Sequence, residues 1–349
     1  MSAPDVYLRS VGSALPGERI DNAMLARRFG QNRLWEQWVA MFVGTSSRYL
    51  AVDLDTAEVR FSLADLGETA AHAALSRAGI TAQDVDVVVL GTATPDQLMP
   101  ATVNLIADRL GINDVPTYQM QSGCTGALQA LDVARQLIAS GRHHTVLVLG
   151  GDVCAKHFDL SVEFGDRSPG EQINALLFGD GAGAAVLSAE PGPGKQVVVR
   201  DLFVRFTGLG RPPGQTVEWF GLADRGADRP GAFEDYKAIE LGVPVLAVEI
   251  LDELLDRTGW AKDELDVVFP PQLSGRMTQT IVKEMGLAPA TREVSCVAQT
   301  GNNGNALPFL QLEQGLDELA PGSRSVLVAV ESSKWIKAGL ALEVAYSKG

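Results

Sequence analysis

The sequence predicts an α/β fold built from two similar halves. Three observations predict it: continuous apolar runs, segments of helical apolar spacing between them, and an internal repeat. The apolar runs are clearest at residues 84–91 and 145–150, and such runs are typical of strands buried on both faces of a parallel sheet. We therefore expect sheets covered by helices in both halves of the chain.

The internal repeat relates segments that lie 180 residues apart. Residues 75–90 align without a gap on residues 255–270, and six of the sixteen pairs are identical. Such periodicity favours a duplicated βα unit over chance similarity. It predicts two subdomains about a pseudo-twofold axis, which we place at residues 1–190 and 191–349.

The remaining elements follow from local patterns taken in order. A strand is expected near the start, and a glycine-rich turn leads into another strand before residue 187. Helices are expected after Asp21 and over residues 61–78 and 101–110. Residues 189–235 are rich in proline and glycine, which predicts a loop-rich connection between the halves.

Composition excludes several classes of function. The net charge of −14, with scattered Lys and Arg, argues against nucleic-acid binding. No apolar run reaches membrane-spanning length, and the N-terminus shows no secretory signal. The three cysteines show no CxxC spacing, so we expect neither disulfides nor a metal site. These features predict a cytoplasmic protein.

Cys124 is the candidate nucleophile. It lies between a short strand-like segment and a helix whose apolar residues begin at Leu128. The free N–H groups and positive dipole end of a helix favour the thiolate, which is the reactive form of cysteine. The alternative is a small buried hydrophobic residue, the commonest role of a free cysteine. If the halves are duplicated, the turn at residues 301–304 is expected to meet Cys124 at a shared site.

Motifs spread over nearly the whole chain support the catalytic interpretation. They are Gly12-Ser-Ala-Leu-Pro16, Trp38 with Gly44 and Arg48, Thr92-Ala-Thr-Pro-Asp96 with Pro100, Ser122-Gly-Cys124-Thr-Gly126, Phe178-Gly-Asp-Gly-Ala-Gly183, and the Gly301-Asn302 turn. With these motifs the sequence resembles the β-ketoacyl-acyl-carrier-protein synthase III group of thiolase-fold condensing enzymes.

The resemblance implies a thiolase-like fold with layers in the order α-β-α-β-α and a homodimeric enzyme. Its cysteine, here Cys124, takes an acyl group from coenzyme A or an acyl carrier protein and passes it to a second substrate. No tightly bound cofactor is implied, since the acyl thioester is itself a substrate. The oxyanion hole would combine the backbone N–H of Cys124 with that of Ser333. Pantetheine-binding positions fall at Trp38, Ser274 and Arg276.

The departures from the family pattern fall at its catalytic positions. The family's Pro-His-Gln-Ala-Asn motif matches residues 270–274, where Pro271 replaces the histidine and Ser274 the asparagine. All four histidines of the chain lie in its first half. Gln272 remains as a candidate catalytic residue. Phe42 stands where coenzyme-A-using relatives often carry an arginine, which favours a carrier-protein donor.

Two further candidates come from the second half. Asn302 keeps the family's catalytic asparagine position, although turn chemistry explains an Asn-rich segment equally simply. Glu331 lies in an altered glycine loop and is a candidate for the missing base. A surface carboxylate is the alternative for Glu331.

Three functions remain open from the sequence. The first is an acyltransferase or condensing enzyme that transfers an acyl group from Cys124 to a specialised-metabolite or carrier-bound acceptor. The second is decarboxylative condensation with malonyl-carrier protein, in which Gln272 and Asn302 replace the usual pair. The third is a degenerate subunit that binds acyl chains or an active homologue. The loss of the histidine favours the first, because that histidine assists decarboxylation in the family.

Overall fold

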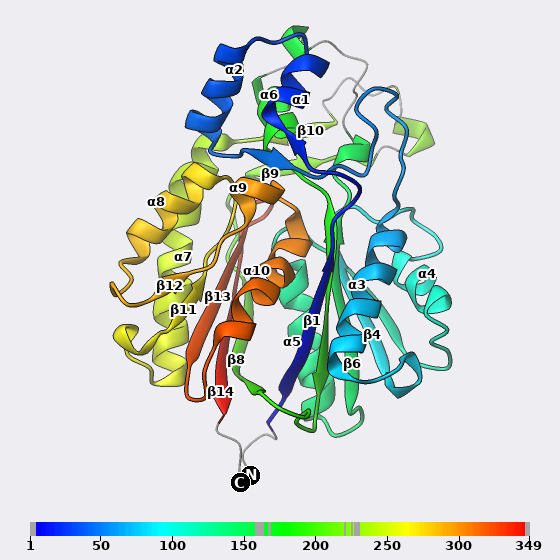
Figure 1. The fold of residues 1–349 in the computed structure, drawn as a ribbon, viewed down its shortest axis with the longest axis vertical. Helices are drawn as coiled ribbons and strands as arrows, with labels where there is room; N and C mark the ends of the chain where they lie inside the picture. The colour runs from blue at the N-terminus through cyan, green and yellow to red at the C-terminus, as the bar shows by residue number, and fades with distance from the viewer. Residues whose placement is uncertain are drawn as a thin grey trace.

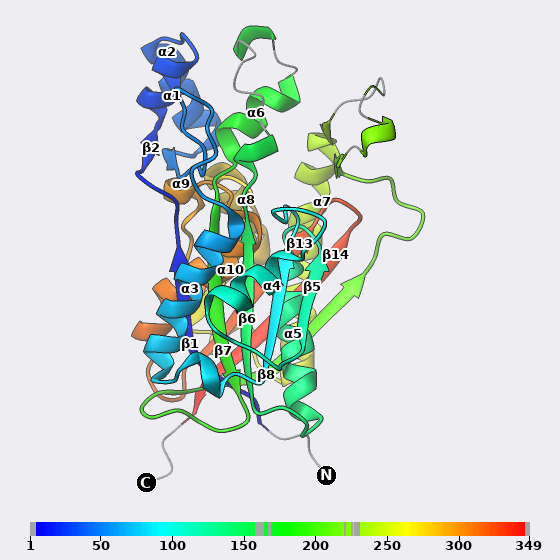
Figure 2. The same ribbon diagram turned by 90° about the vertical axis from the view of Figure 1, so that its right-hand side faces the viewer.

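The computed structural model describes residues 5–157, 164–166, 169–219, 221–224, 226 and 231–345. Residues 1–4, 158–163 and 167–168 of the first predicted half and 346–349 of the second lie outside the described residues, as do parts of the predicted 189–235 connection. Figure 1 shows the fold, and Figure 2 shows it turned by 90°.

Ten strands form two five-stranded halves of one continuous sheet. The first half contains β1 (Tyr7–Ala14), β4 (Val87–Thr92), β5 (Thr117–Gln121), β6 (Thr145–Asp152) and β7 (Gly181–Ser188), in the order β1-β7-β6-β4-β5. The second contains β8 (Gln196–Phe206), β11 (Val267–Phe269), β12 (Arg292–Glu293), β13 (Arg324–Glu331) and β14 (Ile336–Ala345), in the order β8-β14-β13-β11-β12. Both halves therefore follow the same connectivity. A short antiparallel pairing of β1 with β8 joins them, at Tyr7 and Val198.

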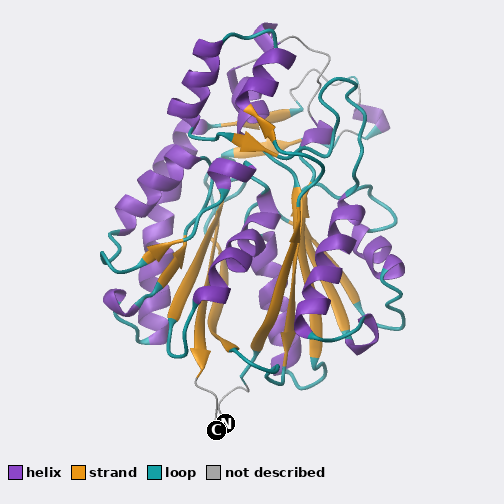
Figure 3. Cartoon of the chain, viewed as in Figure 1, coloured by secondary structure: helices purple, strands orange, loops and turns teal. Residues whose placement is uncertain are grey.

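Helices separate and cover the two halves, as Figures 1 and 3 show. The central pair is α5 (Gly126–Ala139) and α10 (Leu307–Gly315), which share one apolar core with both halves of the sheet through Leu128 and Phe309. The outer helices are α3 (Leu63–Ala78) and α4 (Thr102–Arg109) on the first half, and α7 (Tyr236–Thr258) and α8 (Gly275–Met285) on the second. This confirms the layered α-β-α-β-α fold expected from the resemblance.

The internal repeat is visible in the structure. Helix α3 ends at Gly79 and α7 ends at Gly259, both in the left-handed conformation that glycine adopts without strain. A single 3₁₀ turn follows each glycine, and β4 and β11 then begin at positions 180 residues apart. The prediction of two pseudo-symmetric halves is thus confirmed.

Local signals explain why these elements form. The side chains of Ser62 and Asp65 make a reciprocal capping box at the start of α3. Strand β4 is buried along its whole length, as its continuous apolar run predicts. The helices expected over residues 61–78 and 101–110 are α3 and α4, with ends within two residues of the prediction.

The predicted loop-rich connection at residues 189–235 requires a correction. Residues 196–206 form β8, which pairs with β14 along its length and belongs to the core sheet. The consecutive valines 197–199 and the buried Leu202 and Phe203 give this segment its strand propensity. The prolines and glycines that suggested a loop lie on either side of it.

A cap of shorter elements lies over one end of the sheet (Figure 1). Its helices are α1 (Asn22–Arg28), α2 (Arg33–Trp38), α6 (Pro169–Leu177) and α9 (Val297–Thr300). Its strands form two small antiparallel pairs, β2 (Ile20–Asp21) with β3 (Ser47–Arg48) and β9 (Gln215–Val217) with β10 (Ala232–Glu234). Among the described residues, no helix is long and apolar enough to cross a membrane.

Candidate active site

The nucleophile turn connects β5 to α5 and contains Cys124. The Ser122 N–H donates to the Thr92 carbonyl oxygen over 3.1 Å, which attaches the turn to β4. The backbones of β4 and of the start of α5 pack closely here, so that a Cβ on Gly91 would overlap the Gly126 carbonyl. Cys124 itself is partly exposed and lines a cavity.

Asn305 attaches the nucleophile turn to the second half of the chain. Its Oδ1 accepts the Ala127 N–H over 2.8 Å, and its Nδ2 donates to the Ser122 carbonyl oxygen over 2.9 Å. Nδ2 also donates to Asp152 at the end of β6, whose other carboxyl oxygen accepts the N–H groups of Ala93 and Thr94. The structure therefore brings the two repeat-related turns together, as duplication predicts.

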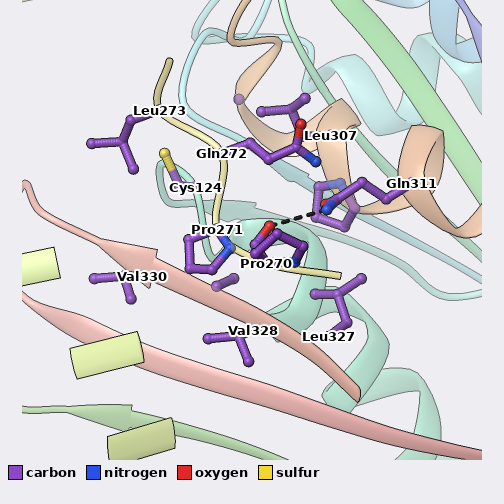
Figure 4. Close-up of a pocket in the computed structure, with 13 residues that line it drawn as sticks. Cys124, Pro270, Pro271, Gln272, Leu273, Leu307, Gln311, Leu327, Val328 and Val330 are labelled. Carbon is purple, nitrogen blue, oxygen red and sulfur yellow. Dashed lines mark hydrogen bonds between the residues drawn. The ribbon is translucent and has the colours of Figure 1, made fainter. Parts of the chain in front are cut away.

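The cavity beside Cys124 has a volume of about 30 Å³, which is room for about one water molecule. Its lining is mostly apolar and comes from the segment after β11, from β13 and from α10. Figure 4 shows these side chains, with the Cys124 sulfur at the edge of the group. The lining residues are Cys124, Pro270, Pro271, Gln272, Leu273, Gly304, Leu307, Pro308, Gln311, Leu327, Val328, Ala329 and Val330.

The expectation of a thiolate at Cys124 is wrong for the protein without substrate. Burial, followed by the charges of Glu331 and Asp152, raises the pKa of the Cys124 thiol well above its ordinary value. The first turn of α5 does little to lower this pKa, because its N–H groups are already hydrogen-bonded. Asn305 accepts the Ala127 N–H, and the Gly123 carbonyl oxygen accepts the Gly126 N–H. The thiol form therefore dominates at neutral pH.

Glu331 ends β13 and lies against the nucleophile turn. It is 2% exposed, and a Cβ on Gly123 would overlap both of its carboxyl oxygens. The surface-carboxylate alternative is thus excluded. Burial raises the pKa of the Glu331 carboxyl, although the Ser333 hydrogen bonds oppose this shift.

The predicted oxyanion-hole amide of Ser333 is already bonded in this structure. Its backbone N–H donates to Oε1 of Glu331 over 3.0 Å. Oε2 of Glu331 is buried and has no hydrogen-bond partner among the described residues. An oxyanion at this position would therefore require the Glu331 carboxyl to turn away from Ser333.

Gln272 lines the cavity and carries an unused donor. Its Oε1 accepts the N–H groups of Cys296 and Val297, each over 2.7 Å, at the start of α9. Its Nε2 is buried without a partner among the described residues. A buried unpaired donor is costly, so this group is a candidate for bonding a substrate carbonyl oxygen.

Asn302 is buried near these residues but does not line the cavity. Its Oδ1 accepts the Gly304 N–H over 3.1 Å, and its backbone pairs with Phe178 and Gly179. The neighbouring Asn303 donates to the carbonyl oxygens of Asp180 and Thr300. These bonds assign turn roles to both residues and leave the catalytic role of Asn302 a prediction.

Two of the three predicted pantetheine-binding residues, Trp38 and Arg276, flank Phe42, and the third, Ser274, caps the helix that carries Arg276. Trp38 and Phe42 stack at 5.9 Å on the exposed face of α2 and the π-helix that follows, with the Arg276 guanidinium 6.0 Å from the Phe42 ring. Ser274 instead caps α8, because its Oγ accepts the Met277 N–H over 3.2 Å. The structure thus groups Trp38 with Arg276 and gives Ser274 a structural role.

Sequence reasoning missed Asp152 and Asn305. Asp152 directly follows a predicted buried strand, and strand ends are common positions for functional side chains, so that signal was available. Asn305 belongs to the Asn-rich turn that drew attention to Asn302.

Comparisons with known proteins agree with this arrangement. Family models match for 3-oxoacyl-[acyl-carrier-protein] synthase III at residues 118–202, for its C-terminal region at 255–333, and for the thiolase N-terminal domain at 41–159. A β-ketoacyl-[acyl-carrier-protein] synthase III of Streptomyces coelicolor is 32% identical over 336 residues, 92% of each chain. A relative from Neisseria meningitidis is 30% identical and covers 88% of this chain and 89% of its own.

Two solved structures show the same fold, one at high and one at low sequence identity to this chain. AbyA1, described as a tetronic acid condensing enzyme, is 57% identical with a TM-score of 0.93, covering 97% of this chain and 99% of its own. The synthase III of Pseudomonas aeruginosa is 26% identical with a TM-score of 0.82, covering 98% and 99%. The chain therefore belongs to the 3-oxoacyl-[acyl-carrier-protein] synthase III family of condensing enzymes.

Proposed function

We propose that this chain joins an acyl group held on Cys124 to a second acyl thioester without decarboxylation, and that the product is a tetronic acid ring. The observation that carries the proposal is the buried Glu331 carboxyl, which lies against Gly123 next to Cys124. The described lining of the cavity at Cys124 contains no histidine. A carboxyl group with a raised pKa suits proton transfer near neutral pH.

Enzymes of this family use acyl thioesters of coenzyme A or of an acyl carrier protein and need no tightly bound cofactor. In the first step the Cys124 sulfur attacks the thioester carbonyl carbon, and the donor thiol leaves with the Cys124 proton. The resulting acyl-enzyme divides one difficult transfer into two easier ones.

The 57%-identical neighbour described as a tetronic acid condensing enzyme indicates the second step. A tetronic acid is a five-membered ring that contains a lactone and a β-carbonyl. Disconnecting its new C–C and C–O bonds gives a β-ketoacyl thioester and a 2-hydroxyacyl thioester. The carbon between the two carbonyls of the first is already acidic, so its deprotonation replaces decarboxylation. This explains why Pro271 can stand where the family has histidine.

Glu331 would remove the proton from the attacking carbon or hydroxyl of the acceptor. The tetrahedral intermediate then expels the Cys124 sulfur, which recovers that proton from Glu331. The second bond closes the ring when the remaining nucleophile, carbon or hydroxyl, attacks the other thioester carbonyl, and the carrier thiol leaves with the proton of that nucleophile. Nε2 of Gln272 is available to bond the carbonyl oxygen on which charge develops. The N–H of Cys124 and, once released by Glu331, that of Ser333 would complete the oxyanion hole.

The unpaired Nε2 of Gln272 also supports the alternative, decarboxylative condensation with malonyl-carrier protein. In that reaction Gln272 and Asn302 would bond the thioester oxygen of the enolate. Release of labelled carbon dioxide from malonyl-carrier protein separates the two functions, because the proposed reaction releases none.

Substrate delivery and assembly are part of the proposal. The exposed Trp38, with Phe42 and Arg276, would receive the pantetheine arm of a carrier protein or coenzyme A. Strand β5 is a sheet edge whose Tyr118 is 44% exposed, and the nearby Met99 is 87% exposed. An open edge beside exposed apolar groups supports pairing with a second copy, as in the predicted homodimer. The cytoplasmic location stays a prediction.

The first experiment measures acylation by intact mass. Incubation with acyl-carrier protein or acyl-coenzyme A should give an acyl adduct that Cys124→Ala abolishes and Cys154→Ala, at another partly exposed cysteine, retains. Glu331→Gln should acylate normally and lose transfer by about 10²- to 10⁴-fold, the usual effect of a general base. No adduct with any donor would instead support the degenerate subunit.

A further inference from the structure

The turn that follows Glu331 contains a tryptophan in a conformation that suits glycine. Residues 332–335 connect β13 to β14, and Trp335 is the last of them. Its φ of 63° lies in the left-handed region, which is unfavourable for a residue with a bulky side chain. Such strain persists only where the surrounding structure holds the residue in place. The contacts of Trp335 therefore decide the geometry of this turn.

The Trp335 side chain is anchored by the segment at residues 207–214, which follows β8. Trp335 is 2% exposed and belongs to the apolar core that α7 and α8 form with the second half of the sheet. Its indole Nε1–H donates to the Pro212 carbonyl oxygen over 2.8 Å. The Arg211 guanidinium lies over the ring, 3.9 Å from the ring centre, which is a cation–π distance. Burial, a hydrogen bond and a stacked cation thus hold one side chain.

The same segment also holds the backbone of the turn at both ends. At the last position, the Thr207 N–H donates to the Trp335 carbonyl oxygen over 2.8 Å. At the first position, the Gly214 N–H donates to the Ser332 carbonyl oxygen over 3.0 Å. Ser333 lies between these two fixed positions, so its placement depends on them.

Ser333 connects the turn to the nucleophile. Its N–H donates to Oε1 of Glu331 over 3.0 Å, and the Glu331 carboxyl lies against Gly123, next to Cys124. A shift of the turn would therefore move both the predicted oxyanion-hole amide and the proposed base relative to Cys124. Such groups tolerate little displacement, since a misplacement of about 1 Å can cost roughly 100-fold in rate.

We propose that Trp335 is a positioning residue for the chemistry of Cys124. Its ring, anchored on residues 211–212, fixes the turn, which holds the Ser333 N–H against Glu331 and Glu331 against the nucleophile turn. Trp335 acts through these two residues and not on the substrate. The inference goes beyond the proposed function, because it concerns the placement of these groups and not the identity of the acceptor.

The test measures the pH dependence of Cys124 alkylation by iodoacetamide, which needs no substrate. Burial raises the pKa of this thiol, as do the charges of Glu331, Asp152 and Glu234. Trp335→Gly removes the ring and leaves a residue that adopts a positive φ without strain. If the ring places Glu331, the alkylation midpoint should move to lower pH. Acyl transfer from Cys124 should slow by about 10- to 100-fold.

Two controls separate positioning from general destabilisation. In the Glu331→Gln background, Trp335→Gly should leave the midpoint where Glu331→Gln alone puts it, because the displaced charge is already gone. Phe203→Ala removes a buried ring from the same apolar core, so it should lower the melting temperature and leave the midpoint unchanged. Trp335→Phe keeps a ring over Arg211 and should keep the midpoint close to that of the unmodified protein.

Arg211→Ala tests the same anchor if Trp335→Gly does not fold. Loss of a positive charge by itself favours the thiol and raises the midpoint, so a midpoint that falls would support the anchoring role, and one that stays or rises would contradict it. An unmoved midpoint in Trp335→Gly, or an equal shift in the Glu331→Gln background, would overturn the inference. The proposed function is judged separately by ring formation, since the expected midpoint shift without ring formation would refute that function alone.

Discussion

The carboxyl group of Glu331 occupies the space where a side chain of residue 123 would lie. A Cβ on Gly123 would overlap both carboxyl oxygens, so glycine at this position and the buried glutamate depend on each other. The contact joins the end of β13 in the second half to the nucleophile turn in the first. Because the carboxyl lies this close to Cys124, it also acts on the charge state of the thiol.

Gly123→Ala should displace Glu331 and lower both stability and transfer activity. The overlap involves a buried side chain with one oxygen bonded to Ser333, so relief requires breaking that bond or moving the turn. Overpacking of this kind costs about 1–3 kcal/mol. Chemical denaturation measures the free energy of unfolding of the variant against the unmodified protein.

Glu331→Ala added to Gly123→Ala is the control, because it removes the atoms that the new methyl group meets. The double variant should recover most of the lost stability but not the transfer activity. Strictly additive destabilisation in this cycle would show that the two residues do not compete for space.

Glu331→Gln should make Cys124 more reactive toward iodoacetamide. After burial, the Glu331 charge is the largest contribution that raises the pKa of the thiol, and a carboxylate disfavours a nearby thiolate. Replacing it with a neutral amide lowers that pKa, so the thiolate fraction at a fixed pH near 8 rises and alkylation accelerates several-fold. The midpoint of the alkylation rate against pH should move to lower pH.

Glu240→Gln provides the matched control, since it removes one negative charge at an exposed position of α7 and should leave the alkylation midpoint in place. An unchanged midpoint in Glu331→Gln would mean that burial alone sets the pKa of Cys124.

Gln272→Glu should slow the transfer step and spare acylation. The new carboxylate can still accept the N–H groups of Cys296 and Val297, so the start of α9 keeps its cap. The unpaired Nε2 donor is lost, and removing one oxyanion donor typically costs about 10²- to 10³-fold in rate. Rapid quench of the pre-acylated enzyme separates transfer from acylation. Transfer at the normal rate, in a variant with a normal melting temperature, would assign Gln272 a capping role only.

The overall fold could be predicted because its signals are local or repeated. The apolar run of β4 and the segments that end at Gly79 and Gly259 indicate buried strands and duplication without tertiary information. Strand β8 was obscured, because flanking proline and glycine lowered the expectation of a strand that tertiary pairing with β14 stabilises.

The site could be predicted only in part, because its electrostatics depend on distant contacts. The position of Cys124 follows from a local turn motif, but its protonation state depends on Glu331 and Asp152. Asn305 bonds Ser122 across 183 residues of sequence, and no local pattern indicates that contact. The cap that Ser274 makes for α8 likewise becomes visible only in the structure, through its bond to Met277, and its pantetheine-binding role stays a prediction.

Asn305→Ala should loosen the nucleophile turn, and it should lower the rate of Cys124 acylation as well as the stability. It removes the bonds to Ala127 and Ser122 and leaves the buried Asp152 with one fewer donor, a change worth about 2–4 kcal/mol when several buried groups lose partners. Asn303→Ala is the comparison, because Asn303 is equally buried and also loses two bonds, to the carbonyl oxygens of Asp180 and Thr300. Both variants should melt at lower temperature. Only Asn305→Ala should also slow acylation of Cys124 by intact mass, because only its bonds hold the Cys124 turn against the second half of the chain. Equal loss of acylation in the two variants would reduce the role of Asn305 to general stability.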